Sequence, residues 1–173
     1  MRYSPGEIDA ILASMKIIVD TREQDTPALK RRMAGFGCPA IRQKLDFGDY
    51  SMQFTAPDGS VQNGQNIAVV ERKMSLDELA SCFTAGRKRY QREFERAKCS
   101  GTKIHLIVEG GDWEKLYNGK YRSRFLPQSF VASHLSWAER YNIQLHFCKA
   151  ETTPRLVHDI LKYALREWLL EQE

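Results

Sequence analysis

The order of apolar and polar positions along the chain predicts strands that alternate with helices. Short apolar runs bounded by turn residues, which are typical of buried strands, occupy 16–22, 67–73, 103–108 and 143–147. Apolar residues at helical spacing predict helices over 7–14, 27–34, 75–98, 127–141 and 153–170. No repeat or low-complexity linker divides the chain. We therefore expect a single α/β domain over 1–173, with a central mixed sheet flanked by helices.

Segment 41–54 is also extended, but the side of it that is apolar changes within the segment. Ile41, Leu45 and Phe47 share one face, whereas Tyr50 and Phe54 occupy the other. A β-bulge at Gly48 would shift the alternation in this way, and bulges often re-aim a functional side chain. The pattern therefore directs attention to Asp49, directly after the glycine.

The helix predicted over 75–98 begins at a capping box, Ser75-Leu76-Asp77-Glu78. It carries a strongly basic stretch between residues 87 and 98, with six Lys or Arg against two Glu, in a chain whose net charge is only +4. Lys88, Arg92 and Arg96 follow one another at four-residue spacing and so share a helix face. This face is a candidate for binding DNA phosphates, although a solvated helix face would have the same composition.

Composition excludes several classes of protein. No apolar run approaches the ~20 residues needed to span a bilayer, and no secretion signal is evident at the amino terminus. We therefore expect a soluble protein with no membrane partner, located inside the cell: in the cytoplasm or nucleoid if prokaryotic or viral, in the nucleus if eukaryotic. The four cysteines have no C-x-x-C spacing, which argues against zinc and favours buried, reduced thiols.

The end of strand 67–73 carries an unusual pair of charges. Side chains alternate along a strand, so Glu71 and Lys73 lie on one face while Arg72 points to the other. Asp49 is expected to approach Glu71 from the neighbouring strand, and Asp20, at the end of the first strand, is a candidate third carboxylate. Neighbouring carboxylates repel unless a cation lies between them, and Mg²⁺ or Mn²⁺ prefers such oxygen ligands.

A site of this kind suits hydrolysis of phosphodiester bonds. A bound divalent cation polarises the phosphoryl group and acidifies water, while a lysine offsets the developing negative charge. The spacing of Asp49 and Glu71-x-Lys73 is that of restriction-endonuclease-like nucleases. Taken alone it is weak evidence, because the same residues would also form a structural ion pair.

Several further motifs accompany this spacing. In order along the chain they are Val19-Asp20-Thr21-Arg22-Glu23, Gly48-Asp49-Tyr50, Val70-Glu71-Arg72-Lys73, Asp77-Glu78-Leu79, and Gly86-Arg87 with Gln91. In order and approximate spacing this series resembles the motifs of the XPF-type structure-specific endonucleases. The resemblance is specific over 16–94 and continues to the last helix only in the order of elements.

The resemblance implies a restriction-endonuclease-like fold, a Mg²⁺ or Mn²⁺ cofactor, and cleavage of branched or flap-like DNA in repair, recombination or replication. By position, it makes Asp49 and Glu71 metal ligands, Lys73 the catalytic lysine and Asp20 a further acidic member. Residues that would support the site or bind phosphate are Arg22, Glu23, Arg72 and Arg87. Helical spacing independently places Arg87 and Gln91 on a face directed toward the strands. For Arg72, which points away from Glu71, a structural ion pair is an equal alternative.

Two features depart from the family pattern. The sequence leaves no room for a tandem helix-hairpin-helix domain or a helicase domain, which puts junction specificity in doubt. Family members usually form homodimers or heterodimers through their last helices. Helix 153–170 is apolar over more than one stripe, which suits contact with both the core and a partner, although a helix fully buried in a monomer would look similar.

The remaining polar and aromatic residues give weaker signals. The four histidines have no ligand-like spacing, and the three tryptophans are expected to pack in the core or an interface. The loop residues Tyr117, Tyr121, Arg122 and Arg124 are a further candidate for nucleic-acid contact. Two other functions remain open: a non-catalytic DNA-binding partner subunit of a nuclease complex, and another phosphodiesterase, such as a resolvase or restriction enzyme.

Overall fold

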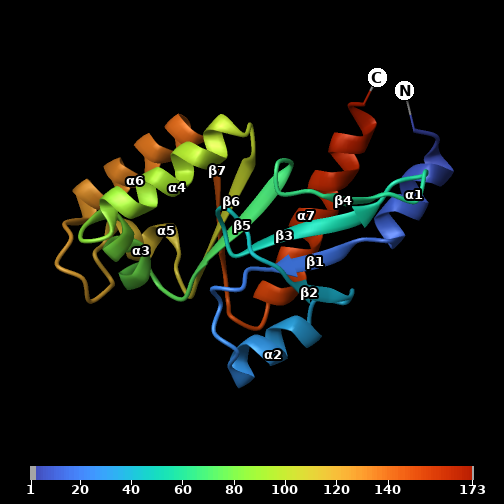
Figure 1. Cartoon of the computed structure of the whole chain (residues 1–173). Helices are drawn as coiled ribbons and strands as arrows, with labels where there is room; N and C mark the ends of the chain where they lie inside the picture. Colours follow the sequence, from blue (N-terminus) through green and yellow to red (C-terminus); the bar gives the residue numbers. More distant parts are fainter. Residues whose placement is uncertain (1–2, 173) are drawn as a thin grey trace.

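A seven-stranded mixed sheet forms the centre of the computed structural model, which describes residues 3–172 (Figure 1). The strands are β1 (Lys16–Val19), β2 (Ala40–Arg42), β3 (Tyr50–Thr55), β4 (Val61–Asn63), β5 (Ala68–Lys73), β6 (Lys103–Glu109) and β7 (Ile143–Cys148). The helices are α1 (Pro5–Ala13), α2 (Pro27–Ala34), α3 (Leu76–Phe83), α4 (Arg87–Cys99), α5 (Trp113–Tyr117), α6 (Pro127–Tyr141) and α7 (Thr153–Leu170). The prediction of a central mixed sheet flanked by helices is confirmed.

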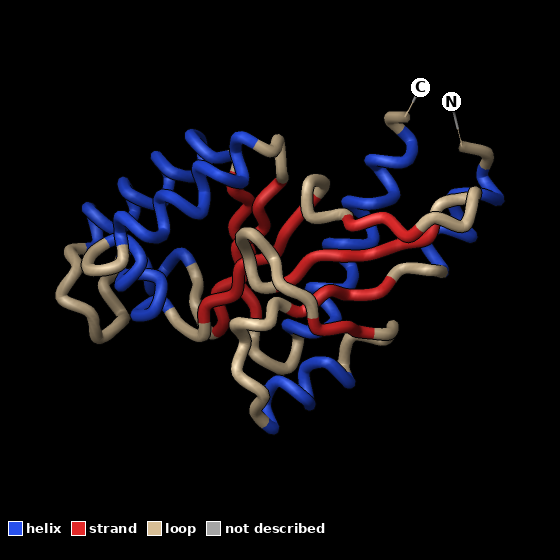
Figure 2. Tube along the Cα trace, viewed as in Figure 1, coloured by secondary structure: helices blue, strands red, loops and turns tan. Residues whose placement is uncertain are grey.

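The strand order is β2-β1-β3-β5-β6-β7, and β4 pairs with β3. Strands β5, β6 and β7 run parallel, whereas β3 is antiparallel to both β1 and β5. Figure 2 shows the resulting strong twist between the β1–β3 half of the sheet and the β6–β7 half. The antiparallel β3–β5 contact is the one that brings segments 49–50 and 70–72 together.

Two apolar cores cover the two faces of the sheet. On one face, α3, α4 and α6 pack an aromatic cluster that includes Phe83, Tyr90, Phe94 and Trp137. On the other face, α1 and α7 cover β1, β3 and β5, and α7 contributes Val157, Leu161, Leu165 and Leu169 to that core. Alternate residues of β5 therefore face different cores, as the period of a strand requires: Val69 faces the aromatic cluster and Val70 faces α7.

The helix predicted over 75–98 is in fact two helices, α3 and α4. The chain turns at Thr84–Gly86, where the Gly86 amide donates to the Ser81 carbonyl at 2.9 Å. The apolar stripe from Leu79 to Ala97 continues across this turn, because both helices pack on the same core. Hydrophobic periodicity therefore predicted the buried face correctly and did not detect the change of direction.

Gly48 does not form a bulge within one long strand, as the alternation of side chains had suggested. Segment 41–54 contains β2, a loop over residues 43–49, and β3, which pair with opposite edges of β1. The apolar face changes because the chain crosses from one strand position to another. Gly48 has φ +76°, a left-handed conformation that glycine adopts without strain.

Other differences from the predicted elements are smaller. Strand β1 ends at Val19 rather than residue 22, and the sequence pattern missed β4 and α5, each too short to show periodicity. All four cysteines are free, as expected, but only Cys82 is buried: Cys38 and Cys148 are half-buried and Cys99 is exposed. No described helix is long and apolar enough to cross a membrane.

Candidate active site

Glu71 and Lys73 lie at the carboxyl end of β5 on the face that packs against α3 and α4. Their side chains are almost fully buried, and the Lys73 Nζ donates to the Glu71 Oε1 at 2.6 Å. The ammonium also lies 5.1 Å from the centre of the Tyr90 ring on α4. Core packing and a direct ion pair thus hold the lysine at the end of the strand.

Asp49 reaches the same place from the loop that precedes β3. Its amide donates to the Val70 carbonyl at 2.9 Å, and its Oδ2 accepts from the Arg72 amide at 2.8 Å. Gly48 permits this close approach, because a Cβ there would lie 2.9 Å from the Val69 Cβ. The predicted approach of Asp49 to Glu71 is therefore present.

The charges of these three residues influence one another strongly. Burial and the nearby Glu71 carboxylate raise the pKa of Asp49 well above its usual range. Burial alone would lower the pKa of Lys73, but the carboxylates of Glu71 and Asp49 raise it. The lysine therefore stays charged, while two carboxylates compete for one nearby cation.

The backbone of Asp20 lies beside the backbone of Asp49, but the Asp20 carboxylate points away from it. The Asp20 amide donates to the Asp49 carbonyl, whereas the Asp20 Oδ1 accepts from the Leu45 amide at 3.1 Å and the Oδ2 accepts from Arg22. Within residues 3–172 no three acidic, histidine or cysteine side chains are close enough together to hold a metal ion. Asp20 anchors the 43–49 loop in this arrangement.

Glu93 on α4 is a carboxylate that the sequence pattern did not single out. It lines a small internal cavity together with Glu71, Gly48 and Val69, and its Oε1 lies 3.8 Å from the Arg22 Nη1. Burial, and then Glu71, raises the pKa of Glu93. Its position one turn after Tyr90 was visible in the sequence, but its acidic neighbours were not, because they come from β5.

Arg72 points to the opposite face of the sheet, as strand alternation predicted. There its guanidinium makes two bonds to the Glu109 carboxylate, at 2.8 and 2.7 Å, and the Thr153 hydroxyl donates to the same carboxylate at 2.6 Å. Glu23 also lies on this side, 3.4 Å from Arg32. Arg72 therefore links β5, β6 and the start of α7 in an ion pair.

The other predicted supporting and phosphate-binding residues lie on α4. Arg87 rests 5.3 Å from the centre of the Trp137 ring, and Gln91 donates to Glu95. The expectation that Arg87 and Gln91 face the strands is wrong, because Tyr90, Phe94 and Ala97 occupy that face. The predicted phosphate-binding residues Lys88, Arg92 and Arg96 are all exposed.

Two other features were not evident from spacing. His105 Nδ1 and His146 Nε2, from neighbouring strands, lie 3.1 Å apart with stacked rings. The second feature is the 118–126 loop: the amides of Arg122 and Ser123 in this loop donate to the carboxylate of Asp77 on α3. That loop, a candidate for nucleic-acid contact, is thus fixed to the start of α3.

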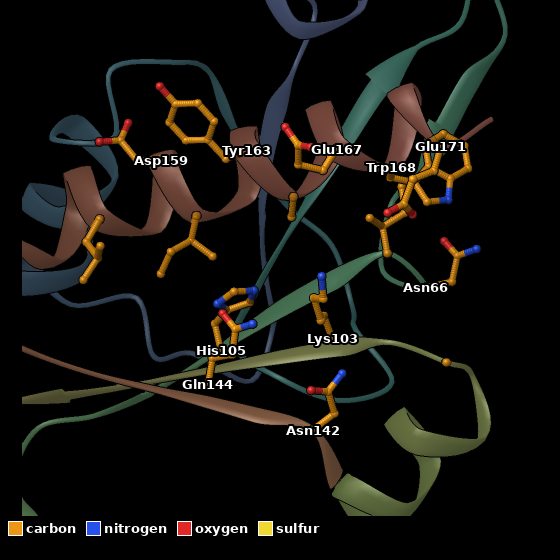
Figure 3. Close-up of a pocket in the computed structure, with 15 residues that line it drawn as sticks. Asn66, Lys103, His105, Asn142, Gln144, Asp159, Tyr163, Glu167, Trp168 and Glu171 are labelled. Carbon is orange, nitrogen blue, oxygen red and sulfur yellow. The ribbon is translucent and has the colours of Figure 1, made fainter. Parts of the chain in front are cut away.

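A cavity of about 650 Å³ lies on the opposite face of the sheet, between α7 and the amino-terminal ends of β6 and β7. Figure 3 shows Asp159, Tyr163 and Glu167 on α7 across from Lys103 and His105 on β6. The cavity exists because α7 packs mainly over β5, and less closely over β3 and β6, and leaves most of the β7 edge uncovered.

The twisted mixed sheet, with an acidic pair and a lysine at the end of one central strand, defines the restriction-endonuclease-like class of fold. The model of the ERCC4 domain matches residues 19–157, so the chain belongs to the ERCC4 domain family, the family of XPF-type nuclease domains. None of the curated proteins matches the chain.

Two solved structures have the same fold. The chain is 23% identical to XPF from Aeropyrum pernix, with a TM-score of 0.61 over 88% of this chain and 69% of that one. For the structure described as XPF from Aeropyrum pernix in complex with DNA, the identity is 22% and the TM-score 0.57, over 88% of this chain and 64% of that one.

Replacement of Arg72 by Ala tests whether this residue stabilises the fold. Loss of the partner leaves Glu109 charged and buried, so the free energy of unfolding should fall by about 3–5 kcal/mol, measured by urea denaturation. The matched control is Arg122→Ala, whose ion pair with Asp77 is exposed and should contribute below about 1 kcal/mol. Equal, small losses in both variants would contradict the structural role and favour a phosphate contact.

Replacement of Asp49 by Asn should stabilise the metal-free protein at neutral pH. Because the folded-state pKa is raised, the stability linked to Asp49 is present below the unfolded pKa of about 3.9 and is lost as pH rises toward the folded value. We expect a rise in Tm at pH 7 on the order of 2–4 °C, the shift for about 1 kcal/mol in a domain of this size.

The same variant should lose any gain in Tm that Mg²⁺ gives the unchanged protein. Asp9→Asn, on the exposed face of α1, is the control and should behave as the unchanged protein in both measurements. A lower metal-free Tm for Asp49→Asn, or a full response to Mg²⁺, would refute this account of the charge at Asp49.

Proposed function

We propose that this protein is a metal-dependent DNA endonuclease, a hydrolase of phosphodiester bonds. The observation that carries the proposal is the convergence of Asp49, Glu71 and Lys73, from a loop and a neighbouring strand, in a chain of the ERCC4 domain family. A structural ion pair would not require Asp49, since Lys73 alone neutralises Glu71. Two carboxylates beside one lysine therefore support a site that receives a further cation.

Asp49 and Glu71 would hold Mg²⁺ or Mn²⁺, with Asp20 and Glu93 as the nearest candidates for a further acidic member. Two carboxylates suffice for Mg²⁺, which keeps several waters and takes other ligands from substrate phosphates. When bound, the metal polarises the phosphoryl group and acidifies water. Asp49 and Glu71 fit this demand, because the two carboxylates lie close together and the Lys73 ammonium pairs with only one of them.

Lys73 would stabilise the negative charge that develops on the phosphoryl oxygens. Its raised pKa keeps the ammonium protonated at neutral pH, and its packing against Tyr90 fixes its direction. Arg22 lies between Asp20 and Glu93 and has half of its side chain exposed, so it can meet an incoming phosphate without leaving the site.

DNA is the proposed substrate, and branched or flap-like DNA the preferred form. Support comes from the family, from the XPF structure in complex with DNA, and from the basic surface formed by Lys88, Arg92 and Arg96. Arg87 would contribute to DNA binding indirectly, by holding α4 in place through its packing on Trp137, and Gln91 would support the same helix through its bond to Glu95.

A non-catalytic partner subunit is the second candidate function, because such a protein would keep the fold and the DNA surface. It would have no chemical need for the half-buried Asp49 beside the buried Glu71 and Lys73. A different phosphodiesterase on the same core would share the chemistry and differ in the DNA structure that it cleaves.

Association of two protomers, or of one protomer with a related chain, is proposed to involve α7. Leu161 and Leu165 are fully buried in the core, but a second stripe that includes Leu156, Ile160 and Trp168 is only partly covered, and Tyr163 is 60% exposed. This stripe borders the cavity beside the uncovered β7 edge (Figure 3). A partner seated there would bury both.

Cleavage assays test the nuclease. Purified protein with Mg²⁺ or Mn²⁺ should cut flap, fork or four-way-junction DNA faster than duplex or single strand, and EDTA should abolish cutting. Lys73→Ala should lower the turnover number on the order of 10²-fold or more while DNA binding is kept. Glu71→Gln should impair metal binding, with Glu139→Gln, exposed on α6, as control. Undiminished cutting by Glu71→Gln would remove the proposed site, and absence of cutting by the unchanged protein would favour the partner subunit.

Light scattering tests the assembly. If the second stripe of α7 forms the interface, Ile160→Glu and Tyr163→Glu should halve the molar mass in solution and weaken DNA binding, because a second basic surface is lost. Leu161 and Leu165 are unsuitable positions, since a charge there would disrupt the core. Arg166→Ala, exposed on the same helix, is the control. An unchanged mass in both folded variants would exclude this interface.

A further inference from the structure

The loop over residues 118–126, which joins α5 to α6, is strongly basic. It contains Lys120, Arg122 and Arg124 and no acidic residue. All three cations are exposed, and 93% of the Arg122 side chain is accessible to solvent, whereas the three residues that alternate with the cations and follow them are half-buried. The loop therefore has an outer side made of cations and an inner side directed at the protein.

The inner side of the loop is attached to the rest of the domain. Asp77 on α3 accepts from two consecutive amides of the loop, each at 2.7 Å. The Tyr121 hydroxyl donates to the Phe125 carbonyl at 2.8 Å, and both rings lie against Phe130 of the aromatic core. Because these contacts already order the backbone, a ligand of the outer side would not have to order it on binding.

The charges of the loop have few partners within the fold. Arg122 lies 3.5 Å from Asp77, but that carboxylate also accepts the two amides. Within residues 3–172, no hydrogen bond or ion pair involves the side chain of Lys120 or Arg124. The loop thus carries an excess of positive charge that the fold does not neutralise and that suits an anionic ligand.

The loop is fixed beside the candidate active site, next to α3 (Figure 1). Asp77 follows Lys73 by four residues, so even a fully extended chain would separate their Cα atoms by no more than about 15 Å. The connection is ordered, since Glu78 accepts from the Met74 amide at 2.7 Å and Ser75 caps α3. A duplex, whose major groove alone is about 12 Å wide, is large enough to reach the loop while one of its phosphates lies at Lys73.

The nature of the outward side chains decides which form of DNA fits. Proteins that bind unpaired strands present aromatic rings on which the bases stack. Here the aromatic residues of the loop, Tyr121 and Phe125, turn inward and the outer positions carry cations. Cations without a stacking surface suit the phosphates of a double helix, whose bases are already stacked.

We infer that the 118–126 loop binds the sugar-phosphate backbone of duplex DNA beside the cleavage site, with Lys120, Arg122 and Arg124 as the phosphate ligands. This inference rests on the proposed endonuclease and names the part of the substrate that the loop holds, the paired arm next to the cut. It also revises the set of loop residues that the sequence suggested: Tyr121 belongs to the anchor of the loop, and Lys120 joins the two arginines.

The test measures binding by fluorescence anisotropy in EDTA, so that cleavage plays no part. The probes are a labelled duplex of about two helical turns, roughly 20 base pairs, and an oligothymidylate of equal length. Lys120→Ala, Arg122→Ala and Arg124→Ala should each weaken duplex binding about 3- to 10-fold and reduce its salt slope by about 0.9. Lys149→Ala, an exposed cation after β7, and Tyr117→Ala, an exposed ring on α5, are controls that should leave duplex affinity unchanged.

Each outcome supports or overturns the inference. Weaker duplex binding by the three loop variants, with smaller effects on oligothymidylate and a normal Tm, supports it. Unchanged duplex affinity, an equal loss for oligothymidylate, or an equal loss in the Lys149 or Tyr117 control overturns it. Cleavage of branched DNA by the unchanged protein is measured separately with Mg²⁺. Its absence would refute the endonuclease, whereas the binding of the loop variants would still decide whether the loop holds duplex DNA.

Discussion

The structure depends on the antiparallel contact between β3 and β5. Through it the Asp49 carboxylate accepts the Arg72 amide, and the Asp49 amide donates to Val70, so one carboxylate is fixed beside another at the end of a buried strand. Such proximity is unfavourable for the metal-free protein, as the raised pKa of Asp49 records. It persists because the strand pairing and the two cores over-determine the position of the loop.

The two faces of β5 divide the charged residues between two tasks. Glu71 and Lys73 face α3 and α4, where Tyr90 and Glu93 complete their surroundings. Arg72, between them in sequence, emerges on the other face and ties β5 to Glu109. Three consecutive residues thus serve the site and the fold at once, and alternation along the strand keeps the two sets of charges apart.

Helix α4 carries three kinds of residue on three of its sides, and the fold gives each a different environment. Tyr90, Phe94 and Ala97 pack in the aromatic core, Glu93 lies beside Glu71, and the arginines at 92 and 96 face solvent. The turn at Thr84–Gly86 sets this orientation, because it lets α4 change direction after α3 while it stays on the same core.

The sequence by itself determined the elements with strong periodicity, including the bounds of α2, α6 and α7 to the residue. It also determined that Glu71 and Lys73 lie on one face of their strand and Arg72 on the other. Both results follow from local repeats, of 3.6 residues in a helix and 2 in a strand. Only the tertiary structure decided which side chains meet across the sheet. It turned Asp20 toward Leu45, brought Glu93 to Glu71, and divided helix 75–98 in two. Contacts between distant segments depend on strand order and helix direction, and no local pattern of apolar and polar residues encodes either.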